Sequence, residues 1–310
     1  MPDIRRWDLL AYGDPCMDLT LDLEGLPEPG GKVLARPALQ SAGGTTANAA
    51  CAVSRLGGRA AIFGRVGADA FGEALRGSMR EDGVDIEHLQ TVNGQSSGVA
   101  ISLLPPGGDR ALVVAPMAPP PPPFLTQRLH DAMLQSRVIY VMPYDQRELE
   151  RICHLARRTG TRIAIDLEPS VASDRQAMEQ RMALADLVFF NEAGFRAGTG
   201  EAPSVEALAS LKAHLDPGPA CIVVTMGAAG AMAVDQHGVI QQSAFATQVR
   251  DTTGAGDAFN AAFVLAYLEG NSLPACLRFA CAVSSFVVAK LGARAGLPSR
   301  AAVNALLLND

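Results

Sequence analysis

The stretch Asp251-Thr252-Thr253-Gly254-Ala255-Gly256-Asp257-Ala258-Phe259 places a glycine-rich turn between two carboxylates. The residues that follow are apolar and predict a helix over 257–268. A glycine turn that leads into a helix presents unpaired backbone N–H groups at the positive end of the helix dipole. The turn Gly254–Gly256 is therefore predicted to bind an anion such as a phosphate.

Asp257 lies at the edge of this predicted anion site, where a carboxylate is a poor choice for binding a phosphate. Its position makes sense if the side chain removes a proton from a hydroxyl that attacks the phosphate. Such a base needs no raised pKa, because proton transfer can lag in a loose transition state. The alternative is an ordinary helix start in which Asp257 only stabilises the dipole.

The length fits one large α/β domain, which would span residues 1–310, or two smaller ones. Of the 310 residues, 48% are hydrophobic and 19% are charged, which supplies a large core. The net charge is −6 without a basic run, so no nucleic-acid partner is expected. No apolar run reaches membrane-spanning length, and the N-terminus lacks a secretory apolar region. A cytoplasmic protein without a membrane partner is therefore expected.

Short apolar runs alternate with helical stretches along most of the chain. Strands are predicted at 9–13, 61–65, 138–142, 162–167, 187–190 and 221–225. Helices are predicted at 48–56, 71–82, 146–158, 175–185, 205–215, 257–268 and 273–290. This alternation predicts a doubly wound, mostly parallel sheet flanked by helices on both faces.

Two segments, at about 15–40 and 97–118, break this alternation. The second contains a predicted hairpin, with strands at 99–104 and 111–114. Because these pieces do not fit a parallel core, we expect them to form a small separate β-sheet that serves as a lid. The proline run 119–123 is predicted to be a stiff connector, with an SH3-like ligand as the alternative.

The opening nonapeptide resembles the C-terminal signature of the PfkB, or ribokinase-like, family of sugar and nucleoside kinases. Five other segments resemble further motifs of this family, in order along the chain: 13–18, 43–50, 64–72, 191–194 and 224–230. The resemblance implies a ribokinase-like fold and ATP-dependent phosphorylation of a hydroxyl on a sugar or sugar derivative. The chain contains no P-loop and no GxGxxG after a strand, so the helix start at 254–257 is expected to hold the phosphates.

The resemblance also assigns roles to individual residues. It implies that Asp257 is the general base and that Gly254, Ala255 and Gly256 form the anion hole. The residues implied to bind the acceptor are Asp14, Asp18, Gly43, Gly44 and Asn48. Those implied to bind the nucleotide are Asn191, Thr225, Gly227, Gly230 and Thr252.

Magnesium and a monovalent cation such as K⁺ are the implied ions. Glu192 is the candidate for the magnesium role, through water, but Gly194 stands where the family has an acidic residue. Either Glu192 carries that role or the motif is weakened. Asp251 and Thr253, together with the loop 291–296, are implied to bind the monovalent cation.

The acceptor is left open by the sequence. Lys32 lies in the predicted lid and is either a contact for an anionic substrate group or a solvated lysine. Segments 25–32, 64–67 and 292–298 look like the sulfofructose kinase branch, whereas Val113 and Val114 stand where a polar residue would bind a sulfonate. Ribose, fructose, a ketodeoxy acid and a nucleoside all remain candidates.

Two alternatives to a sugar kinase follow from the same residues. One is a nucleoside kinase of the family, against which the scarcity of aromatic residues in the lid argues. The other is a catalytically weak sugar-binding regulator, against which the intact Asp257 argues. The family resemblance further implies a homodimer through the lid, because an exposed sheet edge invites a partner strand.

Overall fold

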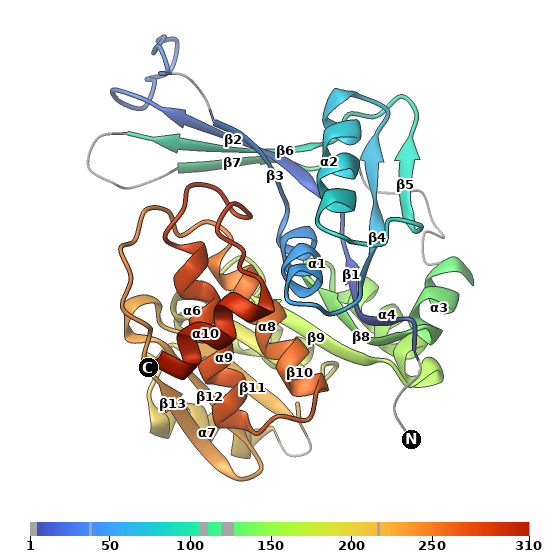
Figure 1. Cartoon of the computed structure of the whole chain (residues 1–310), viewed down its shortest axis with the longest axis vertical. Helices are drawn as coiled ribbons and strands as arrows, with labels where there is room; N and C mark the ends of the chain where they lie inside the picture. The colour runs from blue at the N-terminus through green and yellow to red at the C-terminus, as the bar shows by residue number, and fades with distance from the viewer. Residues whose placement is uncertain (1–4, 37–38, 106–110, 119–126, 216–217, 310) are drawn as a thin grey trace.

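A computed structural model describes residues 5–36, 39–105, 111–118, 127–215 and 218–309. These residues form a large sheet covered by helices and a small sheet that projects from it (Figure 1). The predicted proline connector at 119–123, and the turn of the predicted lid hairpin, lie outside the described residues.

The large sheet has nine strands in the order β13-β12-β11-β10-β9-β8-β1-β4-β5. Their bounds are β1 Trp7–Tyr12, β4 Ala60–Gly67, β5 Leu89–Val92, β8 Ser136–Val141, β9 Arg162–Leu167, β10 Leu187–Asn191, β11 Cys221–Thr225, β12 Ala231–Asp235 and β13 Gly238–Gln242. Neighbouring strands from β5 to β11 are parallel, whereas β12 and β13 are antiparallel additions at one edge. In this sheet the chain continues from β1 to β4 on one side and from β8 to β9 on the other, so the strand order reverses between β1 and β8. Open α/β sheets bind ligands at the carboxyl ends of the strands where the order reverses in this way.

Helices cover both faces of this sheet, as the alternation predicted. One face packs against α1 Thr45–Arg55, α2 Ala70–Glu81, α8 Ala255–Leu268, α9 Leu273–Val287 and α10 Arg300–Asn309. The other packs against α3 Gln127–Leu134, α4 Gln146–Thr159, α5 Arg175–Met182, α6 Glu192–Thr199 and α7 Val205–His214. Helix α8 is buried along most of its length between α1 and α9, which explains why its sequence is apolar on all sides. No described helix is both long and apolar enough to cross a bilayer.

The small sheet has the strand order β3-β2-β6-β7, with bounds β2 Cys16–Asp22, β3 Leu39–Gly43, β6 Gly98–Leu104 and β7 Ala111–Ala115. Strands β2 and β6 are parallel, and the two outer strands are antiparallel to them. The separate lid sheet and its β6–β7 hairpin are thus confirmed. The register pairs Asp18 with Ala100 and Ala100 with Val114, so these residues share the lid face that borders the site described below.

Candidate active site

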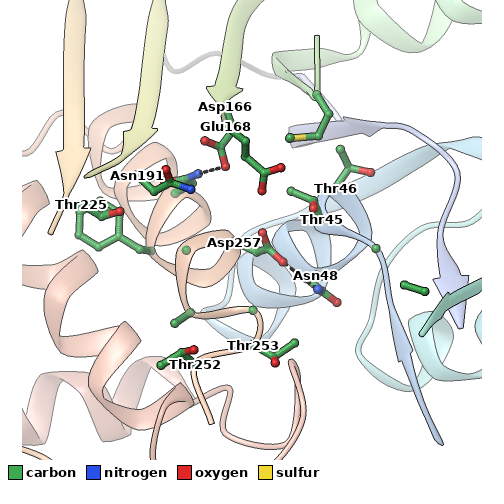
Figure 2. A pocket seen from close by; sticks show the side chains of 18 of the residues that line it. Thr45, Thr46, Asn48, Asp166, Glu168, Asn191, Thr225, Thr252, Thr253 and Asp257 are labelled. Carbon is green, nitrogen blue, oxygen red and sulfur yellow. Dashed lines mark hydrogen bonds between the residues drawn. The ribbon is translucent and has the colours of Figure 1, made fainter. Parts of the chain in front are cut away.

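A cavity of about 1160 Å³ lies where the carboxyl ends of the central strands meet the lid and the start of α8. This volume exceeds the roughly 300–1,000 Å³ typical of a pocket for one small molecule. The cavity is therefore large enough for two substrates side by side. Figure 2 looks into it and shows the side chains of Asp257 and Asn48 pointing toward each other.

The start of α8 has the backbone geometry predicted for an anion site. Gly254 has a φ of 75°, in the left-handed region that favours glycine, and an added Cβ would lie 2.7 Å from Ala293. The N–H groups of Gly254, Gly256 and Asp257 have no hydrogen-bond partner among the described residues, whereas Ala255 donates to the carbonyl of Thr252 at 3.2 Å. Three backbone donors are thus available to a ligand, namely those of two residues predicted for the anion hole, Gly254 and Gly256, and that of Asp257, whereas the amide of Ala255 is already engaged in a turn.

Asp257 projects from the first turn of α8 into the cavity. Its Oδ2 accepts a hydrogen bond of 2.8 Å from the side-chain amide of Asn48. Burial raises the pKa of Asp257 to about 7, and the nearby carboxylates of Glu168 and Asp18 act in the same direction. The sequence argument required no raised pKa, but a value near neutrality suits a general base.

Of the acceptor residues predicted from the sequence, Asp18, Gly44 and Asn48 line the lid side of the cavity, whereas Gly43 is not among the described residues that line it. Asp18 lies on β2, and a Cβ added to Gly43 would lie only 2.0 Å from its Oδ2, so glycine makes room for this carboxylate. Gly44, with a φ of 97°, precedes α1 and lines the cavity. Thr45 and Thr46, in the first turn of α1, also line it but were not predicted.

Asp14 and Lys32 lie differently from the other predicted acceptor residues. Asp14 is in the cavity wall, but its carboxylate forms an ion pair with the buried Arg65 and also accepts from the backbone N–H of Arg65. Asp14 is thus held by Arg65 within the protein. Lys32 is exposed in the segment between β2 and β3 and is not among the described residues that line the cavity.

The five residues predicted to bind the nucleotide all line the opposite side of the cavity: Asn191, Thr225, Gly227, Gly230 and Thr252. Asn191 ends β10 and caps α6 by accepting from the N–H of Gly194 at 2.6 Å. Thr225 ends β11, and the turn that follows needs glycine, since a Cβ at Gly230 would lie 2.0 Å from the carbonyl oxygen of Gln242. Four of the five therefore lie at or just after the ends of the adjacent strands β10 and β11, whereas Thr252 lies in the segment before α8.

The carboxylates that line the cavity include the predicted Glu192 and two that were not predicted. Glu192 borders the cavity, but it is exposed and lies 3.3 Å from Arg196. A Cβ at Gly194 would lie 2.0 Å from the carbonyl oxygen of Leu167, so no larger side chain fits there. Asp166 and Glu168, at the end of β9, project into the cavity and were not predicted (Figure 2).

These oxygen donors fit Mg²⁺, which prefers carboxylates, phosphates and water. The described residues contain no group of three or more His, Cys, Asp or Glu side chains placed to hold a metal ion by themselves. A magnesium ion here would therefore depend on phosphate and water oxygens in addition to carboxylates such as Glu168 and Glu192.

Asp251, in the signature, is hydrogen-bonded to the loop 291–296, which is predicted to bind the monovalent cation together with Asp251 and Thr253. Its Oδ1 accepts from the backbone N–H and the hydroxyl of Thr253, at 2.9 and 2.7 Å. Its Oδ2 accepts from the N–H of Gly292 at 2.8 Å. The residues proposed for the cation are thus adjacent, although the carboxylate of Asp251 already has these protein partners.

The comparisons with known proteins agree with this architecture. The pfkB family carbohydrate kinase profile matches residues 7–300. The chain is 26% identical over 300 residues to a ribokinase of Haemophilus influenzae, across 95% of this chain and 96% of that protein. It is 29% identical over 304 residues to a nucleoside kinase of Methanothermobacter thermautotrophicus, across 94% and 92%.

Its fold matches the structure of Arabidopsis thaliana ribokinase complexed with ribose and ATP. The TM-score is 0.88 and the identity 26%, with 97% of this chain and 98% of that chain covered. The chain therefore belongs to the pfkB family of carbohydrate kinases, phosphotransferases that act on a sugar hydroxyl.

Proposed function

We propose that this protein transfers the terminal phosphoryl group of ATP to a hydroxyl of an uncharged sugar or sugar-like molecule, with Asp257 as the general base. The observation that carries the proposal is the position of Asp257. Its carboxylate and the free N–H groups at the start of α8 border the same cavity, between the predicted acceptor and nucleotide residues. The resemblance to a ribokinase complexed with ribose and ATP supports both substrates.

In this mechanism Asp18, with Gly43 and Gly44, orients the acceptor so that one hydroxyl lies against Asp257. Asp257 takes the hydroxyl proton, and the oxygen attacks the terminal phosphorus in line with the leaving ADP. The N–H groups of Gly256 and Asp257 stabilise the charge on the transferring group. Mg²⁺, when bound, neutralises charge on the phosphates.

The charge of the cavity favours an acceptor without an anionic group. Among the described lining residues the only basic one is Arg65, whose guanidinium pairs with Asp14. Seven lining residues are acidic: Asp14, Asp18, Glu148, Asp166, Glu168, Glu192 and Asp257. A phosphate, sulfonate or carboxylate on the acceptor would be desolvated beside like charges, which disfavours it.

A nucleoside is the second candidate acceptor. The apolar part of the wall includes Leu112 and Val114 of the lid and the ring of Tyr144. These side chains remain 56%, 56% and 62% exposed, so they offer an apolar surface on which a base could pack. The similarity to a nucleoside kinase gives the same acceptor independent support.

The lid also supports a homodimer. Val113 on the edge strand β7 is 53% exposed on the lid face opposite to that of Leu112 and Val114. A second copy that pairs through the lid sheet would cover the edge strand β7. Sedimentation of the purified protein tests this, and a monomer at all concentrations would contradict it.

An ADP-release assay with Mg²⁺-ATP tests the proposed reaction. The acceptors are ribose, fructose and nucleosides, beside sulfofructose, fructose 6-phosphate and 2-keto-3-deoxygluconate. We expect turnover with a member of the uncharged group and a loss of about 10²–10⁴-fold in Asp257→Asn. Turnover only with anionic acceptors would overturn the charge argument, and an active Asp257→Asn variant would overturn the role of Asp257.

A further inference from the structure

Arg294 is a buried cation without a carboxylate partner. Its side chain lies in the loop after α9 and is 7% exposed. Within the described part of the chain no acidic group lies within 4 Å of its guanidinium. Its hydrogen bonds go instead to three neutral oxygens: Asn48 Oδ1 at 2.8 Å, the Gly43 carbonyl at 3.0 Å and Ser78 Oγ at 3.3 Å. Burial of a charge without a counter-ion is costly, so this arrangement requires an explanation other than simple stabilisation.

The partner of Arg294 that matters for the site is Asn48. A guanidinium has only donors, whereas a side-chain amide has an acceptor oxygen and a donor nitrogen. The contact with Arg294 therefore requires Asn48 to turn its oxygen toward the arginine. The NH₂ group must then face the other way, where it donates to Asp257 Oδ2 at 2.8 Å.

We propose that Arg294 is a positioning residue that sets the orientation of the Asn48 amide and thereby keeps Asp257 available as a base. Without Arg294, the amide of Asn48 can turn over and present its oxygen to Asp257. A carboxylate beside that oxygen is stable only when it is protonated, so the turned amide would favour the form of Asp257 that cannot accept a proton. This inference rests on the proposed function, in which Asp257 is the base.

The electrostatics around Asp257 agree with this role. Four acidic or phenolic neighbours lie around it on three elements, namely Asp18 on β2, Asp166 and Glu168 at the end of β9, and Tyr140 on β8. The hydrogen bond from Asn48, whose amide Arg294 orients, opposes them most, and the positive charge of Arg294 itself adds to this. Asn48 and Arg294 thus act together against the groups that favour protonation of Asp257.

Arg55 provides a matched control, because it holds the same loop without touching Asn48. Its guanidinium donates to the carbonyls of Arg294 and Leu297, at 3.2 and 3.4 Å, and pairs with Asp82. If Arg294 only fixed the loop, loss of either arginine would affect Asp257 alike. If Arg294 acts through Asn48, only its own loss would do so.

The experiment measures the titration of the Asp257 carboxyl by ¹³C NMR in the ligand-free protein, for wild type, Arg294→Met, Arg294→Lys and Arg55→Gln. Loss of a hydrogen bond to a charged group should raise the pKa of Asp257 by about one to two units in Arg294→Met. Arg294→Lys should stay near wild type, because an ammonium group also only donates. Equal shifts in Arg294→Met and Arg55→Gln, or no shift in Arg294→Met, would overturn the proposal.

A second readout needs no variant. In wild type, the side-chain amide protons of Asn48 should shift with the apparent pKa of Asp257, since one of them donates to that carboxylate. Amide signals that do not change across this titration would contradict the contact. Neither NMR measurement requires turnover, so a failure of the proposed kinase reaction remains distinguishable from a failure of this inference.

If the kinase reaction is confirmed, the pH dependence of kcat adds a third readout. Arg294→Met should lose about 5- to 50-fold in kcat at pH 7, with recovery toward pH 9 and little change in the KM for ATP. A loss that does not recover at high pH would indicate a misplaced acceptor and contradict the proposal.

Discussion

Replacement of Asp257 by asparagine should stabilise the ligand-free protein at alkaline pH while it removes activity. The folded protein raises the pKa of this carboxyl from 3.8 to about 7, mainly by burial. Between these two values the folded state holds a proton that the unfolded chain has released, so stability falls as the pH rises. Above about pH 7 the full cost of the charged group is present. Asparagine is neutral and of similar size, so it removes this cost.

The magnitude follows from the difference between the two pKa values. About three units at ~1.4 kcal/mol each set an upper bound of ~4 kcal/mol. Because Asp257 is only half-buried and borders the cavity, screening reduces this, and we expect ~1–2 kcal/mol. That corresponds to a rise of roughly 2–4 °C in Tm at pH 8.

Differential scanning calorimetry of wild type and Asp257→Asn from pH 4 to 9 measures this effect. The difference in Tm should grow between pH 4 and 7 and stay constant above. Glu201→Gln, which removes an exposed carboxylate, is the control and should show no such trend. An Asp257→Asn protein that is no more stable than wild type at pH 8 would refute the reasoning.

Three further changes test other parts of the structure. Gly194→Ala should lower the free energy of unfolding, measured by urea titration, by ~1–3 kcal/mol, because the added Cβ meets the Leu167 carbonyl. Gly77→Ala, where the added Cβ lies in open space on α2, is the control, and equal effects of the two substitutions would contradict this. His88 is buried, neither of its ring nitrogens is hydrogen-bonded among the described groups, and burial lowers its pKa. The wild-type protein should therefore lose stability below about pH 6.5, and His88→Phe should lose less, whereas a parallel loss of Tm in both proteins would contradict this. In steady-state kinetics, Lys32→Met should leave the KM for the acceptor unchanged, whereas Asp18→Asn should raise it about 10- to 100-fold. The reverse pattern would indicate that Lys32, and not Asp18, contacts the acceptor.

The parallel core could be predicted from the sequence because its strands are apolar runs with clear ends. The predicted bounds of β9 and β11 agree with the structure to the residue. The predicted lid strands are equally recognisable, since they alternate and are separated by turn residues. In each case a local pattern carries the information, and the tertiary structure does not override it.

Helix α6 was not predicted, because its stability does not come from its own sequence. It follows β10 without an intervening loop, and Gly194 and Gly198 both lower its intrinsic helix propensity. The cap from Asn191 and the buried ring of Phe195 hold it in place. Strand β5, with four residues at the sheet edge, is similarly too short to show a period.

The candidate site was predicted wherever a contiguous motif marks it. The sequence did not reveal Arg294 as a neighbour of Asn48, because 246 residues separate them and only the fold brings them together. Gly194 is the opposite case, because the sequence shows the change and only the structure explains it. The sequence reveals that an acidic residue is missing, but only the structure shows that the Leu167 carbonyl leaves no room for one.

The most direct test of the central claim is the pH dependence of kcat/KM for the accepted substrate. If Asp257 is the base, wild type should lose activity below an apparent pKa of about 7, and Asp257→Asn should show residual activity without that dependence. A wild-type profile that is flat from pH 5 to 9, or an unchanged inflection in Asp257→Asn, would show that another group takes the proton.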